Sequence, residues 1–175
     1  MANFPIVQVV GYKNSGKTTL MNQLINYFSS KGKQVGSLKH HGHGGEPKMV
    51  KGTDSYGHLQ SGATMSGVQG EKQLQLTLHT TTQIALDDII NMYTAFPLDL
   101  LLVEGYKQAD YPKIVLLTGE EDLHLLDELS NIIAIGAMDE DLLHAQELFS
   151  VHLEQSGSYL PMLVEHIWAK SQRLG

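Results

Sequence analysis

Cysteine is absent from this chain of 175 residues, and arginine occurs once, at Arg173. Without cysteine there is no disulfide framework and no thiolate to ligate a metal or attack a substrate. Phosphoryl-transfer enzymes usually depend on arginine to neutralise the charge that develops on the transferred group. The scarcity of arginine therefore argues for weak catalysis at any phosphate site of this protein.

Long apolar runs and runs of basic residues are missing as well. No stretch approaches the roughly 18 apolar residues that a membrane-spanning helix needs. The formal net charge of −7 creates no overall field that attracts nucleic acid. The first residues lack the basic start and small-residue cleavage site of a signal peptide. We therefore expect a cytoplasmic protein with neither a membrane nor a nucleic acid as its partner.

The order of the apolar segments predicts an α/β fold in a single domain over residues 1–175. Short apolar runs predict strands at residues 5–10, 34–38, 99–103, 113–117 and 131–136. Helical spacing predicts helices at residues 17–31, 86–95, 122–129, 140–149 and 158–170. Apolar strands that alternate with helices indicate a mostly parallel sheet with helices on both faces.

Residues 54–79 interrupt this alternation. Two short strands, at residues 63–68 and 73–79, flank a turn at Gly70 and predict an extra β-hairpin. We place this hairpin at one edge of the sheet. A short helix is expected at residues 55–61, and Asp54 is a candidate for its N-cap.

Residues 11–18 match the phosphate-binding pattern G-x-x-x-x-G-K-[ST], between an apolar strand and an amphipathic helix. Glycine permits the positive φ angles that turn successive N–H groups toward phosphate oxygens. Lys17 would reach the β- and γ-phosphates, and the Thr18 hydroxyl would ligate Mg²⁺. Lys13 either contacts phosphate as well, in cis or across a dimer, or is a solvated lysine. The motif nominates Gly11, Lys13, Asn14, Ser15, Gly16, Lys17 and Thr18 as nucleotide-binding residues.

A P-loop also needs a carboxylate at the carboxyl end of a neighbouring strand, where it holds Mg²⁺ or one of its waters. The strand at residues 99–103 has Asp99 at its start and Glu104 directly after its end. Ligands of parallel sheets bind beyond the carboxyl ends of the strands. Glu104 is therefore the predicted magnesium carboxylate. Asp54 is a candidate for a second one, with helix capping as the alternative.

Lys39, His40, His41 and His43 follow the second predicted strand and so reach the same edge of the sheet. Three histidines within four residues suggest a transition-metal site, although no further spaced ligand completes a tetrahedral set. The other interpretations are a loop that contacts phosphate or substrate, and a solvated loop without a ligand. The composition leaves these alternatives open.

Four blocks of the sequence resemble the molybdopterin-guanine dinucleotide biosynthesis protein B family, in that family's order. They are GYKNSGKTTL at residues 11–20, LKHHGHGG at 38–45, the Asp-Ser and His positions of residues 54–63, and LLLVEGYK at 100–107. The resemblance extends over about residues 5–117 and adds Thr19 to the phosphate-contacting residues.

This resemblance implies a P-loop NTPase fold that binds GTP with Mg²⁺ and forms a homodimer. It also implies an adaptor with slow GTP hydrolysis that acts in molybdenum cofactor biosynthesis beside the guanylyltransferase. Family members often carry an arginine where this chain has Gly57. Its contact would then be lost, or supplied by Lys39, Lys107 or a partner. The competing hypotheses are a P-loop small-molecule kinase and a metal-trafficking GTPase that uses the histidine loop.

Overall fold

The computed structural model of the chain describes residues 2–41, 46–47, 50–144, 147–153 and 158–171. Its main sheet has six strands in the order β2-β5-β1-β6-β7-β8, and every neighbouring pair is parallel. The strands are β1 (Ile6–Gly11), β2 (Val35–Lys39), β5 (Leu100–Glu104), β6 (Lys113–Leu117), β7 (Ile132–Ala137) and β8 (Ser150–His152). The predicted α/β fold with a parallel main sheet is confirmed.

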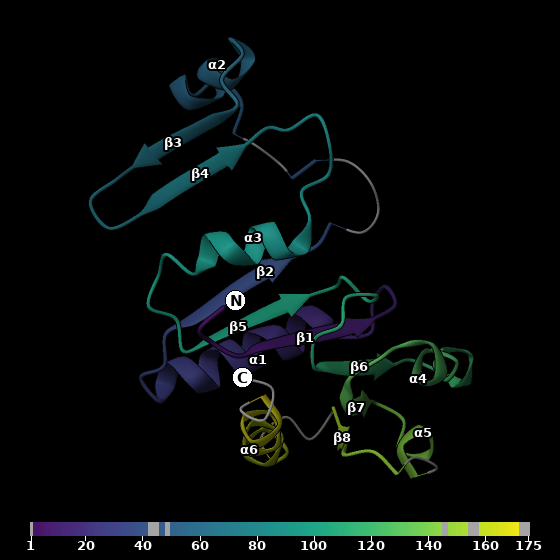
Figure 1. Cartoon of the computed structure of the whole chain (residues 1–175). Coiled ribbons are helices and arrows are strands. Elements are labelled where there is room, and N and C mark those ends of the chain that lie inside the picture. Colours follow the sequence, from purple (N-terminus) through teal and green to yellow (C-terminus); the bar gives the residue numbers. More distant parts are fainter. Residues whose placement is uncertain (1, 42–45, 48–49, 145–146, 154–157, 172–175) are drawn as a thin grey trace.

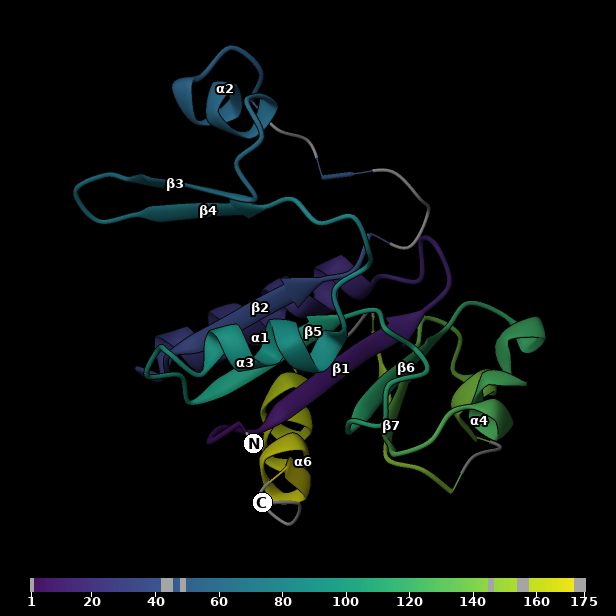
Figure 2. The ribbon, with the colours of Figure 1, turned by 45° about the horizontal axis from the view of Figure 1, so that its top comes forward.

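Helices cover both faces of this sheet (Figures 1 and 2). One face carries α1 (Lys17–Ser30) and α6 (Leu160–Ser171), and the other carries α3 (Leu86–Tyr93), α4 (Leu125–Glu128) and α5 (Asp141–His144). The alternation of side chains along β5 explains the two layers. Leu100 and Leu102 belong to the core beneath α1 and α6, whereas Leu101 and Val103 belong to the core beneath α3.

The extra hairpin is present, but its predicted place at the edge of the sheet is wrong. Strands β3 (Met65–Gln69) and β4 (Leu74–Leu78) form a separate antiparallel sheet, which packs on helix α2 (Asp54–Gln60). These three elements, here called the hairpin lobe, lie beyond α3 and β2 in Figure 1. The helix and the hairpin adjoin in sequence, so local packing against α2 replaces pairing with the main sheet.

The predicted N-cap of α2 is also wrong by one position. The N-cap is Thr53, whose hydroxyl accepts a hydrogen bond of 3.3 Å from the backbone N–H of Tyr56. Asp54 is the first residue of the helix, where a negative charge favours the positive end of the helix dipole. Both residue types fit a helix start, and the backbone conformation decides between them.

Two boundaries in the last third of the chain differ from the prediction. In place of the helix expected at residues 122–129 the structure has the 3-10 helix η1 (Glu120–Asp122) and α4. The Asp122 carboxylate accepts hydrogen bonds from the backbone N–H and the hydroxyl of Thr118, which precedes η1. Of the helix expected at residues 140–149, the described residues form α5, while residues 147–149 are not helical and strand β8 follows. Residues 145–146 lie outside the described part. Among the described residues, no helix is both long and apolar enough to span a membrane.

Candidate functional site

The carboxyl ends of β1, β2 and β5 meet at one edge of the sheet and surround a cavity of about 1110 Å³. All eight residues expected to bind nucleotide line this cavity, together with Lys39, His40, His41 and Glu104. Residues from three separate parts of the sequence are therefore brought together as predicted. Tyr106 and Lys107, which follow the acidic residue, line the same cavity.

The phosphate loop has the backbone that its motif predicts. Asn14 and Gly16 have φ angles of 65° and 86°, in the left-handed region. Gly11 has a φ of 151°, and a Cβ atom at this position would lie 2.6 Å from the Leu116 carbonyl oxygen and from the Ser15 hydroxyl. Glycine is thus required where β1 turns into the loop, because the loop passes directly beside β6.

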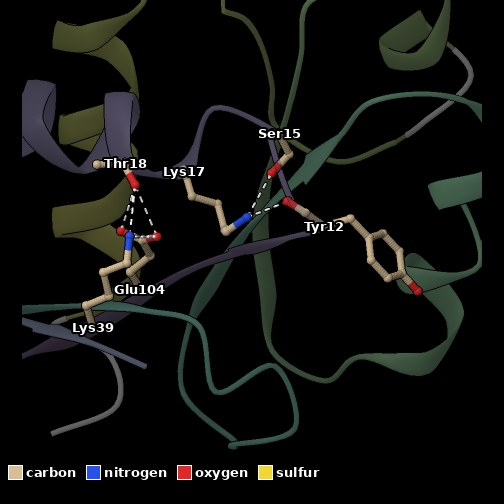
Figure 3. A network of polar contacts seen from close by, with 6 residues as sticks. All are labelled: Tyr12, Ser15, Lys17, Thr18, Lys39 and Glu104. Atoms are coloured by element: carbon tan, nitrogen blue, oxygen red, sulfur yellow. Dashed lines mark hydrogen bonds and ion pairs between the residues drawn. The ribbon is translucent and has the colours of Figure 1, made fainter. Parts of the chain in front are cut away.

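The Lys17 ammonium group lies inside this loop (Figure 3). It donates hydrogen bonds to the Tyr12 carbonyl oxygen and, over 3.4 Å, to the Ser15 hydroxyl. Burial lowers the pKa of Lys17, Glu104 opposes this shift, and the positive charges of Lys107 and Lys39 add to it. An anion in the cavity would favour the charged form of Lys17 and so oppose the lowering of its pKa.

Thr18 and Glu104 are in direct contact although they are far apart in the sequence. The Thr18 hydroxyl lies 3.2 Å from each of the two carboxylate oxygens of Glu104. A hydroxyl and a carboxylate are hard oxygen ligands, which Mg²⁺ prefers. The chemistry of these two side chains fits a magnesium site, and their binding of Mg²⁺ stays a prediction. Asp99 lies at the opposite end of β5, where it accepts a hydrogen bond of 2.8 Å from the Gln34 backbone.

Lys39 completes this cluster (Figure 3). Its ammonium group lies 2.7 Å from a Glu104 carboxylate oxygen and 3.1 Å from the Thr18 hydroxyl. In the parallel pairing of β2 with β5, Lys39 and Glu104 are direct neighbours. The register of the sheet therefore sets the contact between these two charges.

Gln8 is a supporting residue that sequence reasoning did not find. Its side-chain amide donates hydrogen bonds to the carbonyl oxygens of Gly105 (3.0 Å) and Tyr106 (2.8 Å), both of which have positive φ angles. Gln8 is fully buried within β1. A buried polar residue holds the turn after Glu104 in place. Its signal in the sequence is a lone glutamine inside an apolar strand.

Tyr12, in the phosphate loop, is held by residues from two other segments. The Lys107 ammonium lies 3.5 Å from the centre of the Tyr12 ring, within the range of a cation–π interaction. The Tyr12 hydroxyl lies 3.0 Å from His124 Nε2. Burial lowers the pKa of Lys107, while Asp122 and Glu128 oppose the shift. His124 belongs to no local motif, so no pattern in the sequence points to this contact.

The structure does not bring Asp54 to the phosphate cavity. Asp54 lines a second cavity, of about 370 Å³, between α2 and the hairpin. His43 lies outside the described residues, and the described residues contain no group of three His, Asp or Glu arranged to hold a metal. Gly57 stands where family members often carry an arginine, and a Cβ atom placed on it would have no neighbour within 4 Å. Lys39 and Lys107, which were expected to replace that arginine, both line the phosphate cavity.

Comparison with known proteins gives consistent results. The family described as "Molybdopterin guanine dinucleotide synthesis protein B" (MobB) matches residues 6–138. A protein of Bacillus subtilis (strain 168) described as "Probable molybdopterin-guanine dinucleotide biosynthesis adapter protein" is 46% identical over 133 residues, which are 75% of each chain.

Solved structures extend the similarity to the C-terminal part. The crystal structure of Bacillus subtilis MobB has a TM-score of 0.77 and 38% identity, and the match covers 96% of this chain and 98% of that one. The structure of a MobB homolog from Bacillus stearothermophilus has a TM-score of 0.74 and 36% identity, with 94% and 98% covered. Since the family match runs from β1 to β7 and these structures superpose on nearly the whole chain, the chain belongs to the molybdopterin guanine dinucleotide synthesis protein B family.

Proposed function

We propose that this protein is a GTP-binding adaptor in molybdopterin guanine dinucleotide biosynthesis, with at most slow GTP hydrolysis. The observation that carries the proposal is the cavity in which Lys17 lies inside the phosphate loop and Thr18 contacts Glu104. The preference for guanine and the place in the pathway rest on family membership. The expected partner is the guanylyltransferase of molybdenum cofactor synthesis, and the expected location is the cytoplasm.

Lys17 and the loop N–H groups would bind the phosphates, and the N-terminus of α1 would add its positive dipole end. Thr18 and Glu104 would hold Mg²⁺. An Mg²⁺ ion held by these two side chains would neutralise part of the phosphate charge. The residues of this chain therefore bind and orient the nucleotide.

Slow GTP hydrolysis is expected because the cations that line the site are lysines. The cavity is lined by lysine and contains no arginine among its described residues. In P-loop GTPases an arginine that stabilises the transition state accelerates hydrolysis by about 10³–10⁵. Such a site suits an adaptor, whose contacts with its partner change when nucleotide binds, better than it suits a fast catalyst.

The test is equilibrium binding of GTP, ATP and GDP, with and without Mg²⁺, to the wild type and to Lys17→Ala. We expect magnesium-dependent binding that favours GTP, and a loss of about tenfold or more in Lys17→Ala, because a charge-assisted contact to phosphate is removed. Lys33→Ala, which removes a lysine paired with Asp99 at the opposite end of β5, is the control. Equal or tighter ATP binding would contradict the guanine preference.

We also propose that the protein acts as a homodimer that is joined through the hairpin lobe. The pairing of β3 with β4 places Met65, Leu74, Leu76 and Leu78 on one face. Met65, Leu74 and Leu76 are each more than half exposed. The opposite face lies against α2 and lines the second cavity. An uncharged, exposed apolar face of this kind is typical of an interface.

Light scattering coupled to gel filtration tests this interface. We expect a dimer for the wild type and a monomer for Leu76→Lys, because a charge in the centre of the apolar face cannot be buried without a partner. Met92→Lys, at an apolar residue of α3 that is also more than half exposed, is the matched control and should remain dimeric. A dimeric Leu76→Lys variant would place the interface elsewhere.

A further inference from the structure

Lys39 occupies a special place among the lysines of the phosphate cavity. Its ammonium contacts the same two groups that would hold Mg²⁺, namely the Glu104 carboxylate at 2.7 Å and the Thr18 hydroxyl at 3.1 Å (Figure 3). Lys17 instead donates to oxygens of the phosphate loop, and Lys107 lies over the Tyr12 ring. Among the described residues, the ion pair of Glu104 is therefore made by Lys39.

The two partners of this ion pair differ in their freedom to move. The Glu104 side chain is 9% exposed, and the cross-strand pairing of β2 with β5 keeps its backbone next to that of Lys39. The Lys39 side chain is 58% exposed and has a flexible four-carbon stem. The carboxylate is fixed, whereas the ammonium can leave it while remaining in the cavity.

Two cations cannot share this pair of ligands without a large repulsion. The repulsion between two cations in contact with the same carboxylate is strong near a protein surface, and the second charge of a divalent ion doubles it. A metal ion that binds Glu104 and Thr18 must therefore displace the Lys39 ammonium. The triphosphate of a bound nucleotide offers the displaced ammonium a new anionic partner within the same cavity.

We propose that Lys39 is an internal competitor of Mg²⁺: it pairs with Glu104 and Thr18 until the metal takes its place, and it then turns to the phosphates of the nucleotide. This inference rests on the proposed GTP binding for its second half only. The competition for Glu104 concerns only the contacts among Lys39, Thr18 and Glu104. Lys39 is thus a positioning residue that sets how much Mg²⁺ the site requires.

The first measurement is the Mg²⁺ requirement of GTP binding. Lys39→Met keeps most of the stem and removes the charge, so the Mg²⁺ concentration at which GTP binding is half enhanced should fall by about tenfold. In EDTA the same variant should bind GTP several-fold more weakly, because the phosphates lose a cation. Lys39→Arg retains the charge and should require as much Mg²⁺ as the wild type.

The matched control is Lys33→Met, which changes the net charge equally but removes a half-buried lysine that pairs with Asp99 at the other end of β5 and lies over the Trp168 ring. It should leave the Mg²⁺ requirement unchanged. An equal or higher Mg²⁺ requirement in Lys39→Met would overturn the proposal. A fall of similar size in Lys33→Met would also overturn it, since net charge alone would then explain the effect.

The second measurement uses Mg²⁺ alone and separates this inference from the proposed function. Without Lys39 the nearly buried Glu104 carboxylate lacks its counter-ion, so Lys39→Met should unfold at a lower temperature than the wild type. Millimolar Mg²⁺ should raise the unfolding temperature of Lys39→Met more than that of the wild type. When Glu104→Gln is added to both proteins, Mg²⁺ should shift their unfolding temperatures equally. Equal shifts would overturn the competition. Failure of the wild type to bind GTP would overturn the proposed function, and the thermal shifts would still decide the role of Lys39.

Discussion

The phosphate-binding edge of the sheet and the hairpin lobe are built in opposite ways. Every residue of β5 is buried, and Leu100 to Val103 have no exposed surface, so Glu104 stands at the end of a fixed strand. In the described lobe, over residues 54–78, only Leu59 and Ser66 are buried. The sheet packs its apolar residues into its own core, whereas the lobe leaves Leu74 and Leu76 exposed.

This difference teaches where each kind of contact can be made. A cluster of charges such as Lys39, Glu104 and Lys17 needs a scaffold that does not move, because the energy of charge-assisted contacts falls quickly with distance. A surface that joins another chain needs apolar area that its own fold does not cover. The following predictions, from the largest effect to the smallest, test this contrast.

The largest expected effect is on the central strand. Leu102→Ala removes a fully buried side chain from the core under α1 and α6, and it should lower the free energy of unfolding by about 2–5 kcal/mol. Leu76→Ala, in the exposed face of the hairpin, should change the free energy of unfolding of the monomer by about 0.5 kcal/mol or less. Urea unfolding of the dilute proteins measures both values. Similar losses in the two variants would contradict the contrast.

The next effect concerns the phosphate loop. In Gly11→Ala the new Cβ would lie 2.6 Å from the Leu116 carbonyl oxygen, at a φ angle of 151°. Strain and overpacking should lower the free energy of unfolding by about 1–3 kcal/mol. GTP binding should weaken at the same time, because the loop must shift. Gly52→Ala, at a positive φ with no atom within 4 Å, is the control and should leave GTP binding unchanged.

Thr53→Ala tests whether the lobe opens independently of the sheet. It removes the hydroxyl that caps α2 and should destabilise that helix by about 1 kcal/mol. Hydrogen exchange should become faster in α2 and the hairpin, while the amides of β1 and β5 keep their protection. Ser55→Ala removes a hydroxyl that lies 3.2 Å from the Thr53 hydroxyl but leaves the cap in place, so it should have a smaller effect. Faster exchange throughout the main sheet would show that the two regions open together.

The smallest effect is a dependence on pH at the link between α3 and the loop before β6. The Tyr111 hydroxyl donates a hydrogen bond of 2.8 Å to Asp87, and burial together with this carboxylate raises the pKa of Tyr111 to about 12. Since the pKa of an unfolded tyrosine is about 10, the stabilisation is complete below that pH and is lost as the pH rises toward 12.

Tyr111→Phe should therefore lower the free energy of unfolding by about 1 kcal/mol at pH 8, and the difference from the wild type should shrink above pH 10. Urea unfolding at a series of pH values measures it. Tyr27→Phe, at a tyrosine of α1, is the control for the general effect of alkaline pH. If the free energies of unfolding of Tyr111→Phe and the wild type differed by the same amount from pH 8 to 11.5, ionisation of the Tyr111 hydroxyl would not contribute to the stability of the protein.

Local patterns were sufficient for the scaffold. The apolar strands, the helix that begins at Lys17 and the positive φ angles of the phosphate loop are properties of neighbouring residues, so the sequence predicts them directly. The choice of Glu104 over Asp99 also needed only the direction of one strand in a parallel sheet. The two residues indeed lie at opposite ends of β5.

The sequence by itself determined the parallel α/β fold, the phosphate loop and the residues at its edge. Only the tertiary structure decided that Lys39 contacts Glu104, that His124 reaches Tyr12, and that the hairpin packs on α2. These contacts depend on strand register and on segments that are distant in the sequence. Periodicity and motifs record hydrogen bonding and burial within a segment, and they carry no information about which distant segment lies beside it.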